Sequence, residues 1–243
     1  MSEALAIPRP SGPPPLEALR YEIKFVAPAH QRDFVLEWVR GHWAGFVEPY
    51  PPRRINNVYF DSYTLATFHE NLSGTSRRSK VRWRWYGDTH EPERGTLEIK
   101  RRRGGLGWKL SYRTAGLDLR ATTPGGWLAR RRALRASLPP AGRVWLDAHP
   151  LAVLINRYDR RYFLSGDGAV RLTVDWNQRV HDQKLRDTPN LERRANLPDT
   201  IVVELKFPVA EHAHANAIVQ GFPLRLARNS KYVIGVQAIS RGG

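Results

Sequence analysis

The sequence of 243 residues contains no cysteine and only one methionine. The lack of cysteine excludes disulfide bonds, thiolate zinc sites and a cysteine nucleophile, and it is typical of a reducing compartment. Long apolar runs are also lacking, because no stretch approaches the roughly 18 apolar residues of a candidate membrane-spanning helix. We therefore expect a cytoplasmic protein without a membrane segment.

Acidic residues are scarce relative to basic ones. Asp and Glu total 23 against 39 Lys and Arg, so the formal net charge is +16. Such an excess repels itself in a compact fold and implies a polyanionic partner: nucleic acid, an acidic membrane face, nucleotide or polyphosphate. Eight Trp, nine Tyr and eight Phe are enough for a real core and argue against disorder.

The chain divides into a short lead-in and one large domain. Residues 1–18 are rich in proline and lack the charged start and apolar run of a signal peptide, so we predict a disordered lead-in. We expect residues 19–240 to form one domain, since β-barrels often reach this size. Residues 185–199 are a polar loop that is long for a compact domain, either a lid or a disordered segment.

Alternating apolar and polar residues and turn residues predict about eight main strands. We expect strands at 19–27, 54–61, 77–87, 95–103, 108–114, 153–164, 169–176 and 200–207, and a further short strand at 179–184. Helices are expected after Pro28 and at 63–72, 127–138, 144–148, 208–221 and 229–240. No alternation of strands with crossover helices is evident, so the fold class is α+β, mainly antiparallel β, with a closed sheet.

Charged residues recur at every second position of most of these strands. Three segments repeat an acid, an apolar residue and a lysine, namely Glu22-Ile23-Lys24, Glu98-Ile99-Lys100 and Glu204-Leu205-Lys206. A fourth segment carries Lys80, Arg82 and Arg84 with Val81 and Trp83 between them. The same phase continues at Arg20, Arg102, Lys109, Arg113, Tyr158, Arg160, Tyr162, Arg171 and Asp175. Each strand therefore has one charged and one apolar face.

The shared phase favours a basic tunnel. In bulk water, like charges on neighbouring strands would each cost a few tenths of a kcal/mol with nothing to offset them. In a closed barrel they would converge on an anion, with Arg and Lys as donors to phosphate oxygens. The few carboxylates would then hold Mg²⁺ or Mn²⁺. The alternative is a twisted sheet with a solvated basic face.

Two other features bear on the partner and on the helices. Trp83 and Trp85 alternate with the arginines, so we expect them to pack under helices rather than to stack on bases, and we expect no nucleic acid partner. The helix predicted at 127–138 carries four arginines that we expect to form a solvated face, Arg130, Arg131, Arg132 and Arg135.

These residues resemble a known family. Residues 20–25, 58–61 and 80–87 are similar to the VTC domain, the polyphosphate polymerase branch of the triphosphate tunnel metalloenzymes. Further similar segments follow in chain order at 97–100, 158–160, 170–175, 203–206 and 230–232. Arg82-Trp-Arg-Trp-Tyr-Gly87 and Ser230-Lys-Tyr232 are fairly specific elements, whereas a bare Glu-x-Lys is not.

The resemblance implies an eight-stranded antiparallel tunnel with a basic interior and flanking helices. The implied reaction transfers the γ-phosphate of ATP to a growing inorganic polyphosphate chain, with Mn²⁺ or Mg²⁺ as cofactor. The implied phosphate ligands are Lys24, Lys80, Arg82, Arg84, Lys100, Lys109, Arg160 and Lys206. Lys231 resembles the lysine that plugs or lines one tunnel end.

Strand phase extends this set. Arg113 and Arg171 join the predicted phosphate ligands, and Arg82, Arg84, Lys100, Arg160 and Glu204 form the predicted catalytic group. Glu204 resembles the family's metal ligand, and we expect Glu98 or Asp175 to assist it. Glu22 is expected to orient Lys24 or a water.

Two other functions remain open. A triphosphatase would use the same tunnel with water as the attacker, activated by Glu22 or Glu98. A non-catalytic module would bind polyphosphate or another polyanion. The wider superfamily begins with Glu-x-Glu-x-Lys, whereas this chain has Arg20-Tyr-Glu22-Ile-Lys24. A cation in the first acidic position weakens a second metal site, which favours the VTC branch.

Overall fold

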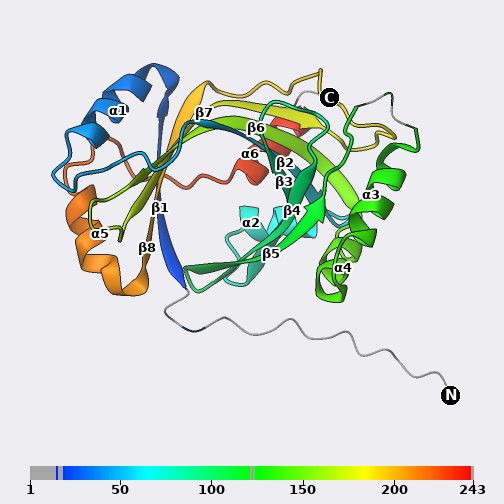
Figure 1. Ribbon diagram of the computed structural model, residues 1–243, viewed down its shortest axis with the longest axis horizontal. Helices are drawn as coiled ribbons and strands as arrows, with labels where there is room; N and C mark the ends of the chain where they lie inside the picture. The colour runs from blue at the N-terminus through cyan, green and yellow to red at the C-terminus, as the bar shows by residue number, and fades with distance from the viewer. Residues whose placement is uncertain (1–14, 16–18, 121, 123, 242–243) are drawn as a thin grey trace.

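Eight antiparallel strands form a closed barrel in the computed structural model, which describes residues 15, 19–120, 122 and 124–241 (Figure 1). Around the ring the order is β1-β5-β4-β3-β2-β6-β7-β8. The bounds are β1 Arg20–Pro28, β2 Arg53–Asp61, β3 Arg78–Tyr86, β4 Arg94–Arg103, β5 Leu106–Ala115, β6 Leu151–Leu164, β7 Arg171–Asp182 and β8 Thr200–Pro208. The predicted α+β class with a closed antiparallel barrel is confirmed, and the predicted lead-in at 1–18 lies outside the described residues apart from Pro15.

Strand β7 corrects one prediction. The short strand expected at 179–184 is wrong, because β7 continues as one strand to Asp182. The register with β6 shifts between Arg157 and Asp159, and Asn177 adopts a positive φ of 52°. A bulge inserts an unpaired residue and reverses the phase of the pattern, which gives two apparent strands in the sequence.

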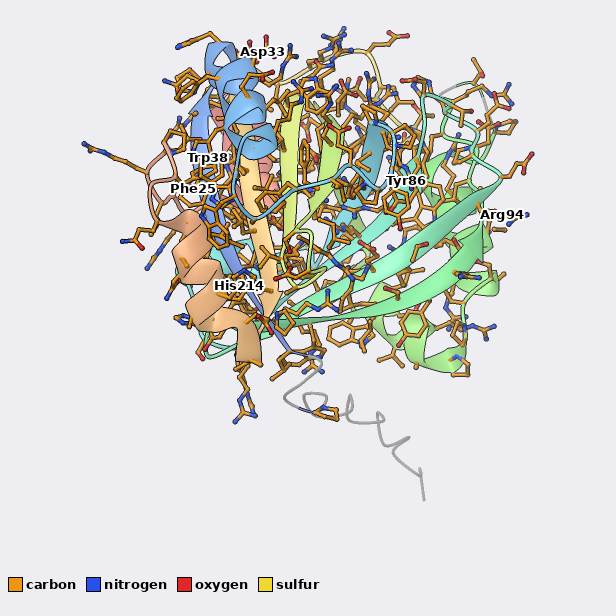
Figure 2. All side chains as sticks on the ribbon, turned by 60° about the vertical axis from the view of Figure 1, so that its left-hand side comes forward. Phe25, Asp33, Trp38, Tyr86, Arg94 and His214 are labelled. Carbon is orange, nitrogen blue, oxygen red and sulfur yellow. The ribbon has the colours of Figure 1, made fainter. Side chains whose placement is uncertain are left out.

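Two helices cover the outer face of β1, β7 and β8. They are α1 (Arg32–Arg40) and α5 (His212–Val219), and a short 3₁₀ turn precedes each of them. Phe25, Val174 and Val203 form a buried cluster there with Val39 and Ile218. Figure 2 shows Phe25 and Trp38 on this side of the barrel. The apolar faces of these strands therefore point outward, as predicted.

Helices α3 (Gly126–Ala136) and α4 (Pro140–Asp147) cover the outer face of the strands around β3 and β4. Trp83 and Trp85 are fully buried there, together with Trp127 and Leu134. The Trp83 indole nitrogen donates to Thr114 Oγ1 at 2.9 Å. The prediction that these tryptophans pack under helices is confirmed.

The solvated arginine face predicted on α3 is only half right. Arg130 is 4% exposed and donates hydrogen bonds to the carbonyls of Asp118, Gly126 and Arg120. Arg131 donates to the carbonyls of Leu146 and His149. Carbonyls in loops and at helix ends lack partners, and the planar guanidinium can reach several of them at once. Arg132 and Arg135 are exposed as predicted.

The helix α6 (Lys231–Arg241) lies across one end of the barrel interior, beside α2 (Ala66–Leu72) (Figure 1). Tyr59, Leu154 and Val180 pack against its Tyr232 and Val236. A Cβ atom added at Gly235 would lie 2.8 Å from Leu154 Cδ2, so glycine permits the close approach. One end of the bore is thus occupied by a helix.

Residues 183–199 run beside β7 and are anchored to it. Ala195 N donates to the Val180 carbonyl at 2.8 Å, and Asn190 Nδ2 donates to the Asp182 carbonyl at 3.2 Å. These bonds hold residues 185–199, the segment expected to be a lid or disordered, against β7. None of the helices in the described part of the chain is long and apolar enough to span a membrane.

Candidate functional site

The charged faces of the strands meet on the inside of the barrel. Cross-strand partners include Lys24↔Glu204, Lys80↔Lys100, Arg82↔Glu98, Lys100↔Lys109 and Arg160↔Asp175. The ring continues through Thr173↔Glu204 and Arg171↔Lys206. Directly paired residues share one face of a sheet, so seven strands direct charge into a common bore. The predicted convergence of the charged faces is borne out by this register.

A cavity of about 460 Å³ occupies the bore. Among the described residues, eleven cations line it: Arg20, Lys24, Lys80, Arg82, Arg84, Lys100, Lys109, Arg160, Arg171, Lys206 and Lys231. The carboxylates in that lining are Glu22 and Glu204. Tyr59 and Tyr158 add hydroxyl groups. The excess of cations gives the cavity the charge and the donors that a chain of phosphates requires.

Glu98 lies behind one wall of the bore and binds the cations of that wall. Its carboxylate accepts from Arg82 Nε and Nη2 at 2.9 and 2.7 Å and from Lys109 Nζ at 2.6 Å. Arg84 Nη1 lies 3.6 Å away. Burial raises the pKa of Glu98, but Arg82, Arg84 and Lys109 outweigh burial and hold that pKa below its usual range. Burial likewise disfavours charge on Arg82, yet Glu98 raises the pKa of Arg82 above its ordinary value.

The two arginines of this wall are also held by neutral groups. Arg82 Nη1 donates to the Tyr59 hydroxyl at 3.2 Å. Arg84 donates to Asn57 Oδ1 at 2.8 Å and to the Tyr158 hydroxyl at 3.1 Å. These contacts fix the direction of both guanidinium groups before any ligand arrives, which is the preorganisation that electrostatic catalysis needs.

Asp175 organises the opposite wall. It accepts from Arg160 Nε and Nη2 at 2.5 and 2.7 Å, and Lys231 Nζ lies 2.6 Å away. Burial raises the pKa of Asp175, but Arg160 and Lys231 outweigh it, so the net pKa is lowered. The first residue of α6 is thereby tied to β6 and β7 inside the bore.

Glu22 and Glu204 share a cation. Lys24 Nζ lies 2.7 Å from Glu22 Oε1 and 3.4 Å from Glu204 Oε2. Glu22 also binds Lys100 at 2.5 Å, and Glu204 also pairs with Lys206. Burial opposes the charge of Lys24, but Glu204 and Glu22 outweigh it and raise the Lys24 pKa. Burial opposes the charge of Glu22 too, but Lys100, Lys24 and Lys206 together outweigh it and the Glu22 pKa falls to about 2.

This pair is the best fit for a divalent metal. Two carboxylates already hold one positive charge between them, and their oxygens are the hard donors that Mg²⁺ and Mn²⁺ prefer. No cluster of three or more acidic or histidine side chains suited to a metal occurs within the described residues. Glu98 and Asp175 are each bound by two nitrogens of an arginine and by a lysine, so the arrangement favours Glu22 as the partner of Glu204.

Two lysines of the bore carry charge at a cost. Lys80 has no carboxylate within ion-pair distance in the described part of the chain. Burial, followed by Lys100 and Lys24, holds the pKa of Lys80 well below its usual value. Burial also lowers the pKa of Lys100 to about 8, against the opposing effect of Glu22. An incoming anion would relieve both groups.

A second cavity of about 510 Å³ continues the basic lining outward near α2 and α6. It shares Lys24, Lys80 and Lys100 with the first cavity. Further arginines line only this outer cavity, namely Arg78, Arg101, Arg102 and Arg228. The bore is therefore open to solvent beside α6 as well.

Most residues predicted for the site come together, and a few do not. Twelve of them line the cavity: Glu22, Lys24, Lys80, Arg82, Arg84, Lys100, Lys109, Arg160, Arg171, Glu204, Lys206 and Lys231. Glu98 and Asp175 lie behind the lining, and Arg113 is exposed outside it. Tyr59 was not predicted. Tyr59 alternates with Asn57, which gives it the phase of an inward-facing residue. The apolar Ile55 on the same face of β2 interrupts the polar pattern, so the sequence does not mark this face as part of the site.

Comparison with known proteins identifies one family. The VTC domain family matches residues 19–240. No curated protein matches. The PH1819 protein from Pyrococcus horikoshii OT3 is 15% identical, with 88% of this chain and 97% of that chain covered and a TM-score of 0.44. A chain of the Schizosaccharomyces pombe Mediator head module is 10% identical, with 86% and 97% covered and a TM-score of 0.45.

Proposed function

The chain belongs to the VTC domain family, which is a tunnel-type phosphoryl-transfer family, and from this premise we propose that it is an ATP-dependent polyphosphate polymerase. The observation that carries the proposal is that, within the part of the chain that the structure describes, eleven cations converge on one bore around two carboxylates that share a cation. This arrangement suits a substrate with several consecutive phosphates. A small, compact anion would not need a basic lining that continues from the bore into a second cavity.

The substrates in this proposal are ATP and an inorganic polyphosphate chain. Arg82 and Arg84 are aimed into the bore by Glu98, Asn57 and Tyr158, and they bind the transferred phosphate by paired hydrogen bonds. The lysines of the bore, together with Arg160 and Arg171, bind the neighbouring phosphates. Phosphoryl transfer depends on positioning and charge neutralisation more than on a protein nucleophile, so this lining supplies its main requirements.

Mn²⁺ or Mg²⁺ would be held by Glu204, with Glu22 beside it. When bound, such an ion would supply positive charge that offsets the negative charge of the phosphates. Lys24 now lies between these carboxylates and is free to turn to a phosphate when they take a metal ion.

The proposed step is an in-line displacement. A terminal oxygen of the polyphosphate chain forms a bond to the γ-phosphorus of ATP. The bond from that phosphorus to the β–γ bridging oxygen breaks, and ADP leaves. Arg82, Arg84, Lys100 and Arg160 stabilise the charge that develops on the phosphoryl oxygens.

Product analysis tests the proposal. The purified protein is incubated with ATP and Mn²⁺, and the products are separated by size. Polyphosphate is identified by its degradation with a polyphosphate-degrading enzyme. We expect ADP and long-chain polyphosphate. Free phosphate as the only phosphorus product would instead identify a triphosphatase, and no turnover with retained polyphosphate binding would identify a binding module.

A Glu204→Gln variant provides the matched control. It removes the charge that a metal needs while keeping the size of the side chain and its place on β8. We expect turnover to fall by about a hundredfold or more with tripolyphosphate binding retained, because the cations of the bore remain. Unchanged turnover would exclude Glu204 from the metal site.

A further inference from the structure

A group of tyrosines lies at the end of the bore opposite α6. Along β6, Leu154 packs against α6, Tyr158 and Arg160 line the cavity, and Tyr162 is the next residue on the same face. The pairing of β2 with β3 and β6 places Tyr86 at this same end. Tyr50 precedes β2. We call Tyr50, Tyr86 and Tyr162 the tyrosine collar.

The collar is connected to the cavity by direct contacts. Arg160 Cζ lies 5.3 Å from the ring centre of Tyr158 and 5.6 Å from that of Tyr162. The rings of Tyr162 and Tyr50 meet edge to face with their centres 6.0 Å apart. Arg53 Cζ lies 4.6 Å from the Tyr50 ring centre and 5.9 Å from that of Tyr162. Aromatic and guanidinium surfaces therefore run without a break from the cavity wall to the outside.

The collar leaves much of its ring surface and its polar groups unused. Tyr50 is 51% exposed and Tyr86 is 48% exposed. Within the described part of the chain, none of the three hydroxyl groups makes a hydrogen bond. Large rings with this exposure at the end of a charged cavity are available to a ligand.

We propose that the tyrosine collar is a nucleobase subsite, so that the bore selects a nucleoside triphosphate over inorganic tripolyphosphate. This inference deepens the proposed function and rests on its assignment of the bore as the triphosphate site. Every nucleobase has a π-face that stacks on an aromatic ring. Arg53 is planar and charged, so it can stack on the base or bind the α-phosphate. The triphosphate then extends from the collar toward Arg160 and Arg84.

A binding experiment with two ligands tests the subsite. The affinities of the full chain for the non-hydrolysable ATP analogue AMP-PNP and for tripolyphosphate are measured by calorimetry with Mg²⁺. Tyr50→Ala is expected to weaken AMP-PNP binding by about fivefold to a hundredfold and to change tripolyphosphate binding by less than about twofold. Tyr50→Trp is expected to retain AMP-PNP binding, because it keeps a ring for stacking.

Tyr63→Ala is the matched control, since Tyr63 is 79% exposed and lies outside the collar. It should leave both affinities unchanged. If Tyr50→Ala and Tyr162→Leu leave AMP-PNP binding unchanged, or weaken both ligands equally, the subsite is excluded. The readout is independent of turnover. Even if the protein makes no polyphosphate, the Tyr50→Ala substitution can still weaken AMP-PNP binding more than tripolyphosphate binding. A wild-type protein that binds neither ligand would overturn the proposed function and the subsite together.

Discussion

At the scale of single residues, the carboxylates described in and behind the lining of the bore each hold at least two cations. Glu98 binds Arg82 and Lys109, and Asp175 binds Arg160 and Lys231. Buried ion pairs add little net stability, because desolvation offsets their attraction. Their effect here is to fix the positions of the cations. The acids of the bore therefore act mainly as supports for a preorganised anion site.

Lys24 lies between Glu22 and Glu204, where the proposed metal ion would bind. Because its ammonium lies between these carboxylates, free Mn²⁺ must compete with a tethered cation. Lys24→Met should therefore strengthen Mn²⁺ binding in the absence of phosphate by about tenfold or more, which corresponds to about 1.4 kcal/mol. Electron paramagnetic resonance of free Mn²⁺ measures this, with Lys109→Met as the control. Equal Mn²⁺ affinity in the wild type and Lys24→Met would contradict the competition.

Lys100 should take up a proton when phosphate binds. Burial lowers its pKa to about 8 in the free protein, and a phosphate beside it would raise that pKa. At pH 8.5 much of Lys100 is neutral before binding, so tripolyphosphate binding should consume protons and weaken as the pH rises above 8. Calorimetry in buffers of different ionisation enthalpy measures the uptake. Proton release, or the same uptake in Lys100→Met, would contradict this prediction.

Most inward-facing residues could be predicted because the period of a strand is two and one-residue shifts are visible in the sequence. The hydrogen-bond and ion-pair partners of these residues could not be predicted. Arg113 has the correct phase but is exposed. Arg130 is buried because it donates hydrogen bonds to backbone carbonyls, and the sequence does not reveal that these carbonyls lie nearby. The pairing of Glu22 and Glu204 around Lys24 depends on the neighbouring positions of β1 and β8, which are distant in the sequence.

At the scale of elements, Asp61 joins a strand to two helices. At the end of β2 it accepts hydrogen bonds from the backbone nitrogens of Thr67 and Phe68 at the start of α2, and from the Tyr232 hydroxyl on α6 at 2.5 Å. The side chain is fully buried. This carboxylate therefore helps to hold the helix that occupies one end of the bore.

Replacing Asp61 should weaken that end of the barrel. Asp61→Ala leaves two helix nitrogens and a buried hydroxyl without an acceptor, and we expect a loss of about 2–4 kcal/mol in the free energy of unfolding. Denaturant unfolding measures the change. Asp33→Ala is the control, because the Asp33 side chain is 78% exposed (Figure 2). Equal stability of the two variants would show that Asp61 does not hold α6.

The position of α6 was not predictable from its sequence. Tyr232, Val236 and Ile239 form the apolar stripe of an ordinary surface helix, yet they pack on inward-facing side chains of β6 and β7. Closure of the sheet was predicted, but the pair of strands that closes it was not predictable. Strand β1 pairs along its length with β8 but meets β5 only at Arg20↔Gly107. This short seam depends on how the whole sheet curls.

At the scale of the whole molecule, the net charge of +16 and the cations of the bore act together. An anion in the bore relieves local and overall repulsion, so binding should stabilise the fold. Tripolyphosphate at 100 times its dissociation constant should add about 2.7 kcal/mol to the free energy of unfolding. The melting temperature should then rise by about 5–10 °C. If sodium chloride at matched ionic strength raised the melting temperature equally, the effect would come from general screening of charge repulsion and not from binding in the bore.

The most direct test is a crystal structure of the protein with tripolyphosphate and Mn²⁺, with the metal located by its anomalous scattering. The account predicts phosphates inside the barrel, within hydrogen-bond distance of Arg82 and Arg84, and Mn²⁺ on Glu204. Tripolyphosphate bound only on the outer surface, with the bore free of phosphate and metal, would contradict it.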